Sequence, residues 1–270
     1  MIVVESGGTK STWVFYDALK KRQTATSVGL HPQELTGEKR EVISRLVEEH
    51  QLKERTIHFF GAGCESQEAK LKVILFLEEF SFNVKQVETD IYAACIAHLG
   101  NHEGIVGIIG TGAVAAHFDG NKVIQQTSGL GYLLGDEGSG FDIGKRLLQA
   151  YFKNELSDEV RLCIEKYFDG KAILHRIYEP DGRMFVAGLT KIVHEFKLEP
   201  VVQKLLNDAF LSFCETALKP LNHNGPIYFI GSVAYYFRKE LAYALSEAGF
   251  QLENVKKEAV YGAFEFLSEE

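Results

Sequence analysis

One order of elements occurs twice in this chain: an apolar strand, a glycine-rich turn and two further strands. The first copy spans residues 2–28, and the second spans residues 104–127. β-Branched and aromatic residues are common in the expected strands, which are residues 2–5, 11–17, 23–28, 104–109, 113–118 and 122–127. A supersecondary unit that recurs within 270 residues indicates a duplicated fold with a cleft between its two halves.

Helical periodicity appears after each copy. The first copy is followed by helices and short strands in alternation, at residues 36–47, 56–60, 66–80, 84–87 and 90–99. The second is followed by mainly helical sequence and then a strand, a helix, an edge strand and a last helix, at residues 141–218, 227–230, 234–245, 250–253 and 258–267. This alternation predicts an α/β fold with domains at residues 1–103 and 104–270, the last helix packing back on the first domain.

Composition excludes several classes of protein. A formal net charge of -8 provides no global basic surface, so we expect no nucleic-acid partner. The four cysteines are far apart and form no CxxC pair, which favours reduced thiols in a cytoplasmic protein. No window approaches about 18 uncharged apolar residues and the amino terminus lacks signal-peptide features, so we expect neither a membrane span nor a secretion signal.

Both glycine turns can serve as ordinary hairpin turns or as phosphate cradles. Each exposes backbone N–H groups directly after an apolar strand, and a threonine adds a hydroxyl donor. The residues concerned are Gly7, Gly8, Thr9 and Lys10 in the first turn and Gly110, Thr111 and Gly112 in the second. A Walker A loop is absent, because neither Gly-Lys pair precedes Ser or Thr, and no Rossmann glycine motif follows the first strand.

Three further segments each have a structural and a chemical interpretation. Asp90 follows an expected strand and begins a helix, so it is either the helix N-cap or a carboxylate that takes a proton from a substrate hydroxyl. Residues 129–140 contain five glycines and the adjacent carboxylates Asp136 and Glu137, which suits a capped loop or close approach to a sugar or metal. Gly231 and Ser232 follow a strand and either cap a helix or face a nucleotide.

Taken in order, these motifs resemble the N-acetylglucosamine kinase family, which is close to the activator ATPases of the BadF/BadG type. The matching segments are ESGGTKS, GAGC, ETD, GTG, GLGYLLGDEGSG and GSVA, and together they span nearly the whole chain. The resemblance implies two ribonuclease-H-like domains of the actin-like ATPase kind, with ATP in the cleft between them. It also implies Mg²⁺, phosphoryl transfer to a hydroxyl of an amino sugar, and a homodimer.

The same resemblance assigns roles to individual residues. Asp90 is the expected general base, and Glu5 is expected to hold Mg²⁺ through water. The two glycine turns are expected to bind phosphates. The other nucleotide contacts would be Gly188, Gly231 and Ser232, and the substrate contacts would be His31, Gly129, Gly131 and Asp136.

The residues that depart from the family pattern lie at positions that bear on which sugar is bound. His31 stands where many members have Asn, and Ala113 and Val114 replace a common Ser-Asn pair. A site that lacks one expected polar partner discriminates strongly, so the acetylated sugar is not the only candidate substrate. Two rival functions stay open: an activator-type ATPase with an iron–sulfur cluster on paired cysteines, and a sugar or nucleotide sensor without activity.

Overall fold

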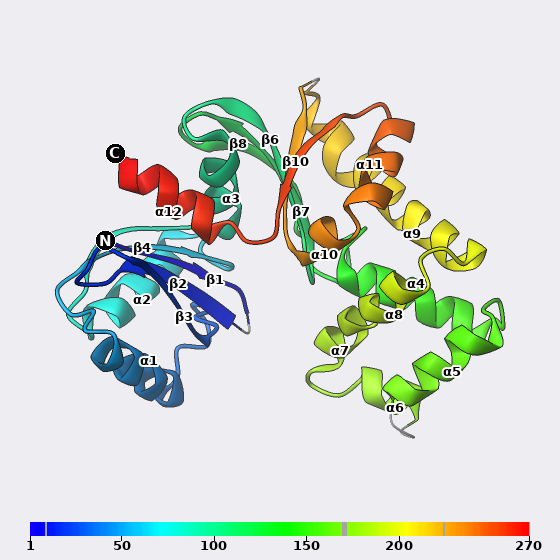
Figure 1. Ribbon diagram of the computed structural model, residues 1–270, viewed down its shortest axis with the longest axis horizontal. Helices are drawn as coiled ribbons and strands as arrows, with labels where there is room; N and C mark the ends of the chain where they lie inside the picture. Colours follow the sequence, from blue (N-terminus) through cyan, green and yellow to red (C-terminus); the bar gives the residue numbers. More distant parts are fainter. Residues whose placement is uncertain (9, 169–171, 224, 270) are drawn as a thin grey trace. The chain divides into compact units, whose positions relative to one another are not determined.

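The computed structural model describes residues 1–270 except 9, 169–171, 224 and 270 (Figure 1). It contains two compact units. Unit 1 comprises Met1–His102, Gly120–Lys122 and Glu258–Glu270, and unit 2 comprises Glu103–Asp119 and Val123–Lys257. Among the described helices, none has both the length and the apolar character needed to cross a membrane.

Unit 1 contains a five-stranded mixed sheet in the order β3-β2-β1-β4-β5. Its strands are β1 (Ile2–Ser6), β2 (Lys10–Tyr16), β3 (Arg22–Val28), β4 (Thr56–Gly61) and β5 (Asn83–Glu88). The first three form an antiparallel meander, whereas β4 pairs in parallel with both β1 and β5. Parallel neighbours require crossover connections, which the helices α1 (Gly37–Glu49) and α2 (Gln67–Glu78) provide.

Helices cover both faces of this sheet (Figure 1). Ile2, Val4, Trp13 and Phe15 alternate along β1 and β2 and pack in one core with α1 and α2. The opposite face contacts α3 (Asp90–Leu99) and α12 (Val260–Glu269), the last helix, which packs on α3. Burial on both faces explains why β1 reads as an almost continuous apolar run.

Unit 2 repeats this topology in the order β10-β9-β6-β7-β8. Its strands are β6 (Glu103–Ile109), β7 (Ala113–Asp119), β8 (Val123–Ser128), β9 (Ile227–Ile230) and β10 (Leu252–Lys256). Parallel pairing joins β6 to β9 and β9 to β10, and antiparallel pairing joins β6 to β7 and β7 to β8. The expected α/β class and the repeated strand order are confirmed.

Helical sequence between β8 and β9 forms several segments rather than one long helix. They are α4 (Gly140–Phe152), α5 (Asp158–Tyr167), α6 (Ile173–Ile177), α7 (Gly182–Gly188), α8 (Thr190–Glu195), α9 (Pro200–Phe213), a π-helical turn η1 (Cys214–Leu218) and a 3₁₀ turn η2 (Lys219–Leu221). The single helix expected at residues 234–245 is wrong. It is divided into α10 (Ser232–Tyr236) and α11 (Arg238–Glu247) at Phe237, whose backbone leaves helical geometry while its buried ring packs against Phe210.

Close packing of α12 on α3 leads to a stability prediction. A Cβ on Gly262 of α12 would lie 2.7 Å from the Ala97 carbonyl oxygen, so Gly262→Ala must push the helices apart. Overpacking of this kind costs about 1–3 kcal/mol, which exceeds the helix-propensity gain of about 1 kcal/mol. We expect a lower urea midpoint, measured by the fluorescence of Trp13, which is the chain's single tryptophan and is buried in unit 1.

Gly37→Ala is the matched control. Gly37 begins α1, and a Cβ there would meet nothing within 4 Å, so this variant should be neutral or slightly stabilised. Equal urea midpoints for Gly262→Ala and Gly37→Ala would contradict the conclusion that α12 packs too closely on α3 to accept a Cβ.

Candidate functional site

The first glycine turn is held from the side by the end of β3. The Gly7 N–H donates to the Lys10 carbonyl (2.9 Å) and closes the hairpin between β1 and β2. A Cβ on Gly29 would lie 2.4 Å from the Gly8 carbonyl oxygen, so only glycine allows this approach. Gly7 and Gly8 are exposed, as a phosphate-binding turn requires, whereas Thr9 lies outside the described residues.

Lys10 begins β2, and its ammonium group lies 3.5 Å from the Glu258 carboxylate. The Lys10 side chain is 55% exposed. An exposed pair of this kind contributes little to stability, so a bound anion could displace Glu258 at small cost.

Glu5 has a structural partner that local sequence does not indicate. Its Oε2 accepts a hydrogen bond from the Val260 N–H (2.8 Å) and so satisfies a backbone donor at the start of α12. The two residues are 255 positions apart, and only the fold brings them together. A role for Glu5 toward Mg²⁺ stays a prediction.

Asp90 is the first residue of α3 and not its N-cap. The cap is Thr89, whose hydroxyl accepts from the Tyr92 N–H (3.3 Å), so the interpretation of Asp90 as a cap is wrong. The Asp90 Oδ1 accepts from the Ile91 N–H (2.8 Å), and the positive end of the helix dipole favours its negative charge. Capping of α3 therefore does not require the Asp90 carboxylate.

Burial is the main influence on the pKa of the Glu5 and Asp90 carboxyl groups. It raises the pKa of Glu5 to about 7, against the hydrogen bond from Val260, and the negative charge of Asp90 acts in the same direction as burial. Burial likewise raises the pKa of Asp90 to about 6, against the hydrogen bond from Ile91, and Glu65 raises it further. β1 and β5 both run parallel to β4, so Glu5 near the end of β1 and Asp90 after β5 lie toward the same edge of the sheet.

These hard oxygen donors fit a cation such as Mg²⁺, which usually binds one or two carboxylates and keeps several waters. A positive charge would lower the electrostatic penalty that burial imposes on both groups.

His31 lies against the loop that follows β4. A Cβ on Gly63 would come within 2.4 Å of its Nε2, so the imidazole rests directly on that loop's backbone. The Gln33 N–H lies 3.3 Å from Nδ1 and fixes the other side of the ring. His31, expected to contact substrate, therefore lies between the end of β3 and residues 61–64. Its role toward a sugar stays a prediction.

The second glycine turn connects β6 to β7 in unit 2. The Gly110 N–H donates to the Gly112 carbonyl (2.9 Å), and the Gly140 N–H at the start of α4 donates to the Gly110 carbonyl (2.7 Å). The turn is thereby tied to the glycine-rich segment 129–140. Thr111 is partly buried within it.

Asp136 joins that segment to the same turn. Its Oδ1 accepts from the Ala113 N–H (3.2 Å), and its Oδ2 lies 3.2 Å from Nη2 of Arg183 on α7. Only 4% of Asp136 is exposed. A carboxylate has about four acceptor positions, so it can hold these two donors and still accept from a sugar hydroxyl.

Arg183 is a site candidate that sequence reasoning missed. A Cβ on Gly112 would lie 3.1 Å from its Nη2, which places a guanidinium directly at the second glycine turn. The Arg183 side chain is 41% exposed and lies 5.2 Å from the ring centroid of Tyr132. A planar donor of this kind suits a phosphate, and no sequence motif pointed to it because it lies 47 residues from Asp136.

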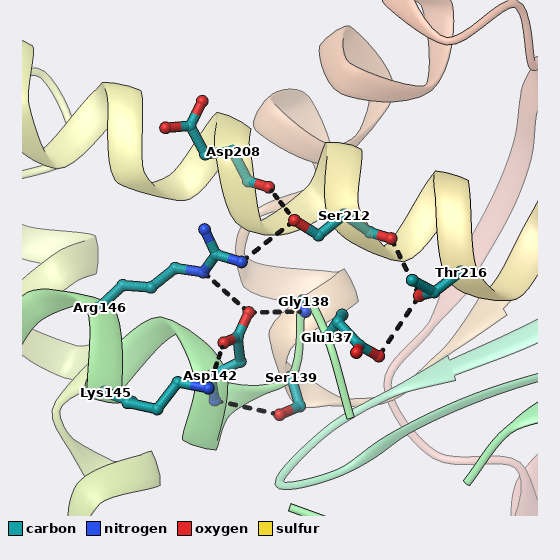
Figure 2. Close-up of polar contacts among 9 residues, drawn as sticks. All are labelled: Glu137, Gly138, Ser139, Asp142, Lys145, Arg146, Asp208, Ser212 and Thr216. Carbon is teal, nitrogen blue, oxygen red and sulfur yellow. Dashed lines mark hydrogen bonds and ion pairs between the residues drawn. The ribbon is translucent and has the colours of Figure 1, made fainter. Parts of the chain in front are cut away.

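The rest of the glycine-rich segment is structural (Figure 2). Ser139 caps α4 by accepting from the Asp142 N–H (3.2 Å), and Asp142 accepts from the Gly138 N–H (3.1 Å). Asp142 also accepts from Nε of Arg146 (2.9 Å), and Arg146 donates to Ser212 of α9 (3.1 Å). Glu137 lies at the far end of this network, because the exposed Thr216 hydroxyl is 3.3 Å from its Oε2 and 2.9 Å from the Ser212 carbonyl oxygen.

Gly129 and Gly131, expected at the substrate, both have positive φ. A Cβ on Gly129 would lie 3.6 Å from a methyl group of Val114, whereas a Cβ on Gly131 would meet nothing within 4 Å. Val114 therefore lies beside one of the two expected sugar contacts.

Among the expected nucleotide contacts of unit 2, Gly231 lies beside the second glycine turn. Gly231 has φ +119°, and a Cβ there would lie 2.3 Å from the Ile109 carbonyl, so glycine is required where β9 approaches the second turn. Ser232 is the first residue of α10 and not its cap, because Gly231 holds the cap position. Ser232 lines a cavity of about 420 Å³ with Thr190, Lys191, His194, Val233, Tyr236 and Phe237. Gly188 itself packs against Tyr167, so its segment reaches this cavity through Thr190 and Lys191.

A larger cavity, of about 640 Å³, borders Arg183. Its lining is mainly apolar and includes Tyr132, Leu133, Phe141, Leu148, Ile177 and Val186. Apolar walls offer few partners for sugar hydroxyls, so we place no sugar there.

Neither a protein-family model nor a curated protein matches the chain. Solved structures do match. A candidate N-acetylglucosamine kinase from Porphyromonas gingivalis is 26% identical, with a TM-score of 0.86 over 100% of this chain and 99% of the other. A candidate N-acetylglucosamine kinase from Chromobacterium violaceum is 19% identical, with a TM-score of 0.73 over 98% of each chain. A ROK-family glucokinase from Streptomyces griseus, solved with glucose and AMPPNP, is 16% identical, with a TM-score of 0.59 over 100% of this chain and 99% of its own.

These matches extend over the whole chain and confirm the expected fold, that of the actin-like ATPases and sugar kinases. Membership of the N-acetylglucosamine kinase family stays a prediction.

The raised pKa of Glu5 predicts a pH dependence of stability. In the unfolded chain its pKa returns to the ordinary 4.5, so its stabilising contribution is complete below that pH and is lost as pH rises through about 7. Glu5→Gln retains an acceptor for Val260 and removes this titration. We expect its urea midpoint, followed by Trp13 fluorescence, to fall less than that of the wild type between about pH 5 and about pH 8.

The exposed Glu49 of α1 provides the control. The urea midpoint of Glu49→Gln should fall with rising pH as much as that of the wild type. If the urea midpoint of Glu5→Gln also falls as much as that of the wild type, Glu5 is not a buried titrating group.

Proposed function

We propose that this protein is an ATP-dependent kinase that transfers the γ-phosphoryl group to a hydroxyl of an amino sugar. The observation that carries the proposal is the position of Asp90, which is partly buried at the start of α3, next to the Thr89 cap, and lies toward the same edge of the sheet as the first glycine turn. The similarity of the whole chain to a candidate N-acetylglucosamine kinase at 26% identity supports it.

Asp90 acts as the general base. With burial raising its pKa to about 6, the carboxyl group is mostly ionised at neutral pH and still basic enough to accept a proton. The attacking sugar hydroxyl gives that proton to Asp90 as its oxygen bonds to the γ-phosphorus and the bond to the leaving ADP oxygen breaks. No covalent enzyme intermediate is required.

The nucleotide phosphates are bound by the two glycine turns. The backbone N–H groups of Gly8 and Gly112, the hydroxyls of Thr9 and Thr111, and the charges of Lys10 and Arg183 supply the donors. Gly7 and Gly110 shape the two turns, because their N–H groups donate to the Lys10 and Gly112 carbonyls. The cavity beside Ser232 takes the nucleoside, with Gly231 allowing close approach. Phosphoryl transfer depends on this kind of fixed positive potential more than on covalent help.

Glu5, which lies toward the same edge of the sheet as Asp90, would hold Mg²⁺ through water. When bound, the metal neutralises charge on the transferred phosphoryl group. The sugar hydroxyls are bound by His31, Asp136 and the backbone around Gly129 and Gly131. Asp136 is suited to this role because Ala113 and Arg183 fix its orientation.

The activator-type alternative is disfavoured by the cysteines. Cys64, Cys95 and Cys214 are buried, and burial raises the pKa of each thiol to about 12. An iron–sulfur cluster needs accessible thiolates, and of the four free cysteines only Cys163 is partly exposed.

The role of Asp90 is tested by Asp90→Asn. Because Thr89 caps α3, stability should change little, while loss of the base lowers kcat by roughly 10²- to 10⁴-fold. ADP release with Mg²⁺-ATP and a panel of hexoses and amino sugars gives kcat, and titration with a non-hydrolysable ATP analogue should show an unchanged Kd.

Thr89→Ala is the matched control for Asp90→Asn. It removes the cap hydroxyl, which costs about 1 kcal/mol of stability, but keeps the base and should keep kcat. Near-wild-type turnover in Asp90→Asn with the preferred sugar refutes the assignment and makes Asp136 the next carboxylate to test.

Sugar preference is tested at the start of β7. Ala113→Ser with Val114→Asn restores two hydrogen-bonding groups beside Asp136 and Gly129, so kcat/KM for N-acetylglucosamine should rise relative to other sugars. Ile124→Asn, which adds an amide at an exposed position of β8, should leave the ratios unchanged. Identical ratios in the double variant would contradict a role for these positions in specificity.

A further inference from the structure

Three side chains of unit 2 outside the proposed kinase site form a compact set of potential metal ligands. They are Glu103, His117 and His223, and one ligand atom from each lies within 4.8 Å of the other two. Glu103 is the first residue of β6, His117 lies in β7, and His223 follows η2. Three separate segments therefore meet at this cluster.

Strand register brings the first two together. Glu103 pairs with Asp119 and Ile105 pairs with His117 across the antiparallel β6–β7 ladder. Glu103 and His117 are thus diagonal neighbours on one face of the sheet. The His117 Nε2 and the Glu103 Oε1 are 2.8 Å apart.

The third ligand is positioned by its loop. Asn222 adopts the left-handed conformation (φ 49°, ψ 44°), which ends η2 and turns the chain. A Cβ on Gly225 would lie 2.4 Å from Nε2 of His223, so glycine leaves the space that this imidazole occupies. The His223 ring centroid lies 4.9 Å from that of His117, with the ring planes inclined by 50°.

An ion pair alone is a weak reason for this arrangement. The Glu103 side chain is 60% exposed, and an exposed ion pair contributes about 0–1 kcal/mol. It also leaves the second imidazole unexplained. Two imidazole nitrogens and one carboxylate oxygen are, in contrast, the donor set of three-ligand zinc sites, whose fourth position holds water.

We propose that Glu103, His117 and His223 form a binding site for a divalent transition metal, with Zn²⁺ as the favoured ion. Imidazole donors select Zn²⁺ and its neighbours over Mg²⁺, which prefers oxygen ligands. The exposed Glu103 leaves the ion a route from solvent, while the His117 side chain, 15% exposed, anchors it to the sheet. Bound metal would tie β6, β7 and the loop before β9 together and so stabilise unit 2.

Calorimetric titration of chelator-treated full-length protein with Zn²⁺ tests the proposal. We expect one ion per chain at this site and a rise in Tm on binding. His223→Gln and Glu103→Gln should each weaken Zn²⁺ binding at least about tenfold, since even loss of an outer-shell partner usually weakens a metal site by 10–100-fold. His117→Gln should weaken Zn²⁺ binding as well. If His117→Gln fails to fold, His223→Gln and Glu103→Gln still test the site.

His175→Gln is the control for casual binding by surface imidazoles, because His175 is 79% exposed on α6. It should keep the wild-type Zn²⁺ affinity. Equal affinity in the wild type and in His223→Gln and Glu103→Gln overturns the site, as does a loss of affinity in His175→Gln as large as theirs. Co²⁺ provides a second readout, since its visible absorption on binding should disappear in His223→Gln.

Discussion

Parallel pairing of the first strand of each unit with a later strand is the constraint on which the site depends. Ser6 pairs with Gly61 across β1–β4, and Ile108 pairs with Ile230 across β6–β9. In each unit the glycine turn after the first strand is therefore brought beside a second loop that is distant in sequence. Backbone donors gather at these edges because the carboxyl ends of parallel strands meet there.

The carboxylates of the two units have different hydrogen-bond partners. In unit 2 the buried carboxylates Asp136 and Asp142 lie within hydrogen-bonding distance of the guanidinium groups of Arg183 and Arg146. In unit 1 the described hydrogen bonds of Glu5 and Asp90 come from backbone N–H groups, and burial raises the pKa of both carboxyls. That difference leaves unit 1 with a negative charge that a cation and a substrate proton can relieve, as the proposed metal site and general base require.

The sequence predicts most of the fold, because strand alternation and helical periodicity are local patterns. Both glycine turns and the helix start at Asp90 are found in this way. Partners that are distant in sequence are not found from local patterns. The bond from Val260 to Glu5 and the contact of Arg183 with Asp136 depend on packing between distant segments. The sequence does not identify the cap of α3, because Thr89 and Asp90 are both good capping residues and only backbone geometry distinguishes them. The homodimer and the sugar stay predictions.

Hydrogen–deuterium exchange with a non-hydrolysable ATP analogue and Mg²⁺ tests the central claim most directly, namely that the paired turns of unit 2 bind the nucleotide. The claim predicts slower exchange in peptides covering residues 109–113, where backbone N–H groups would donate to phosphates, and residues 230–233, which lie beside the cavity proposed for the nucleoside. Peptides from α5 serve as the internal reference and should not change. Unchanged exchange at both turns, under analogue concentrations in the millimolar range, would contradict the account.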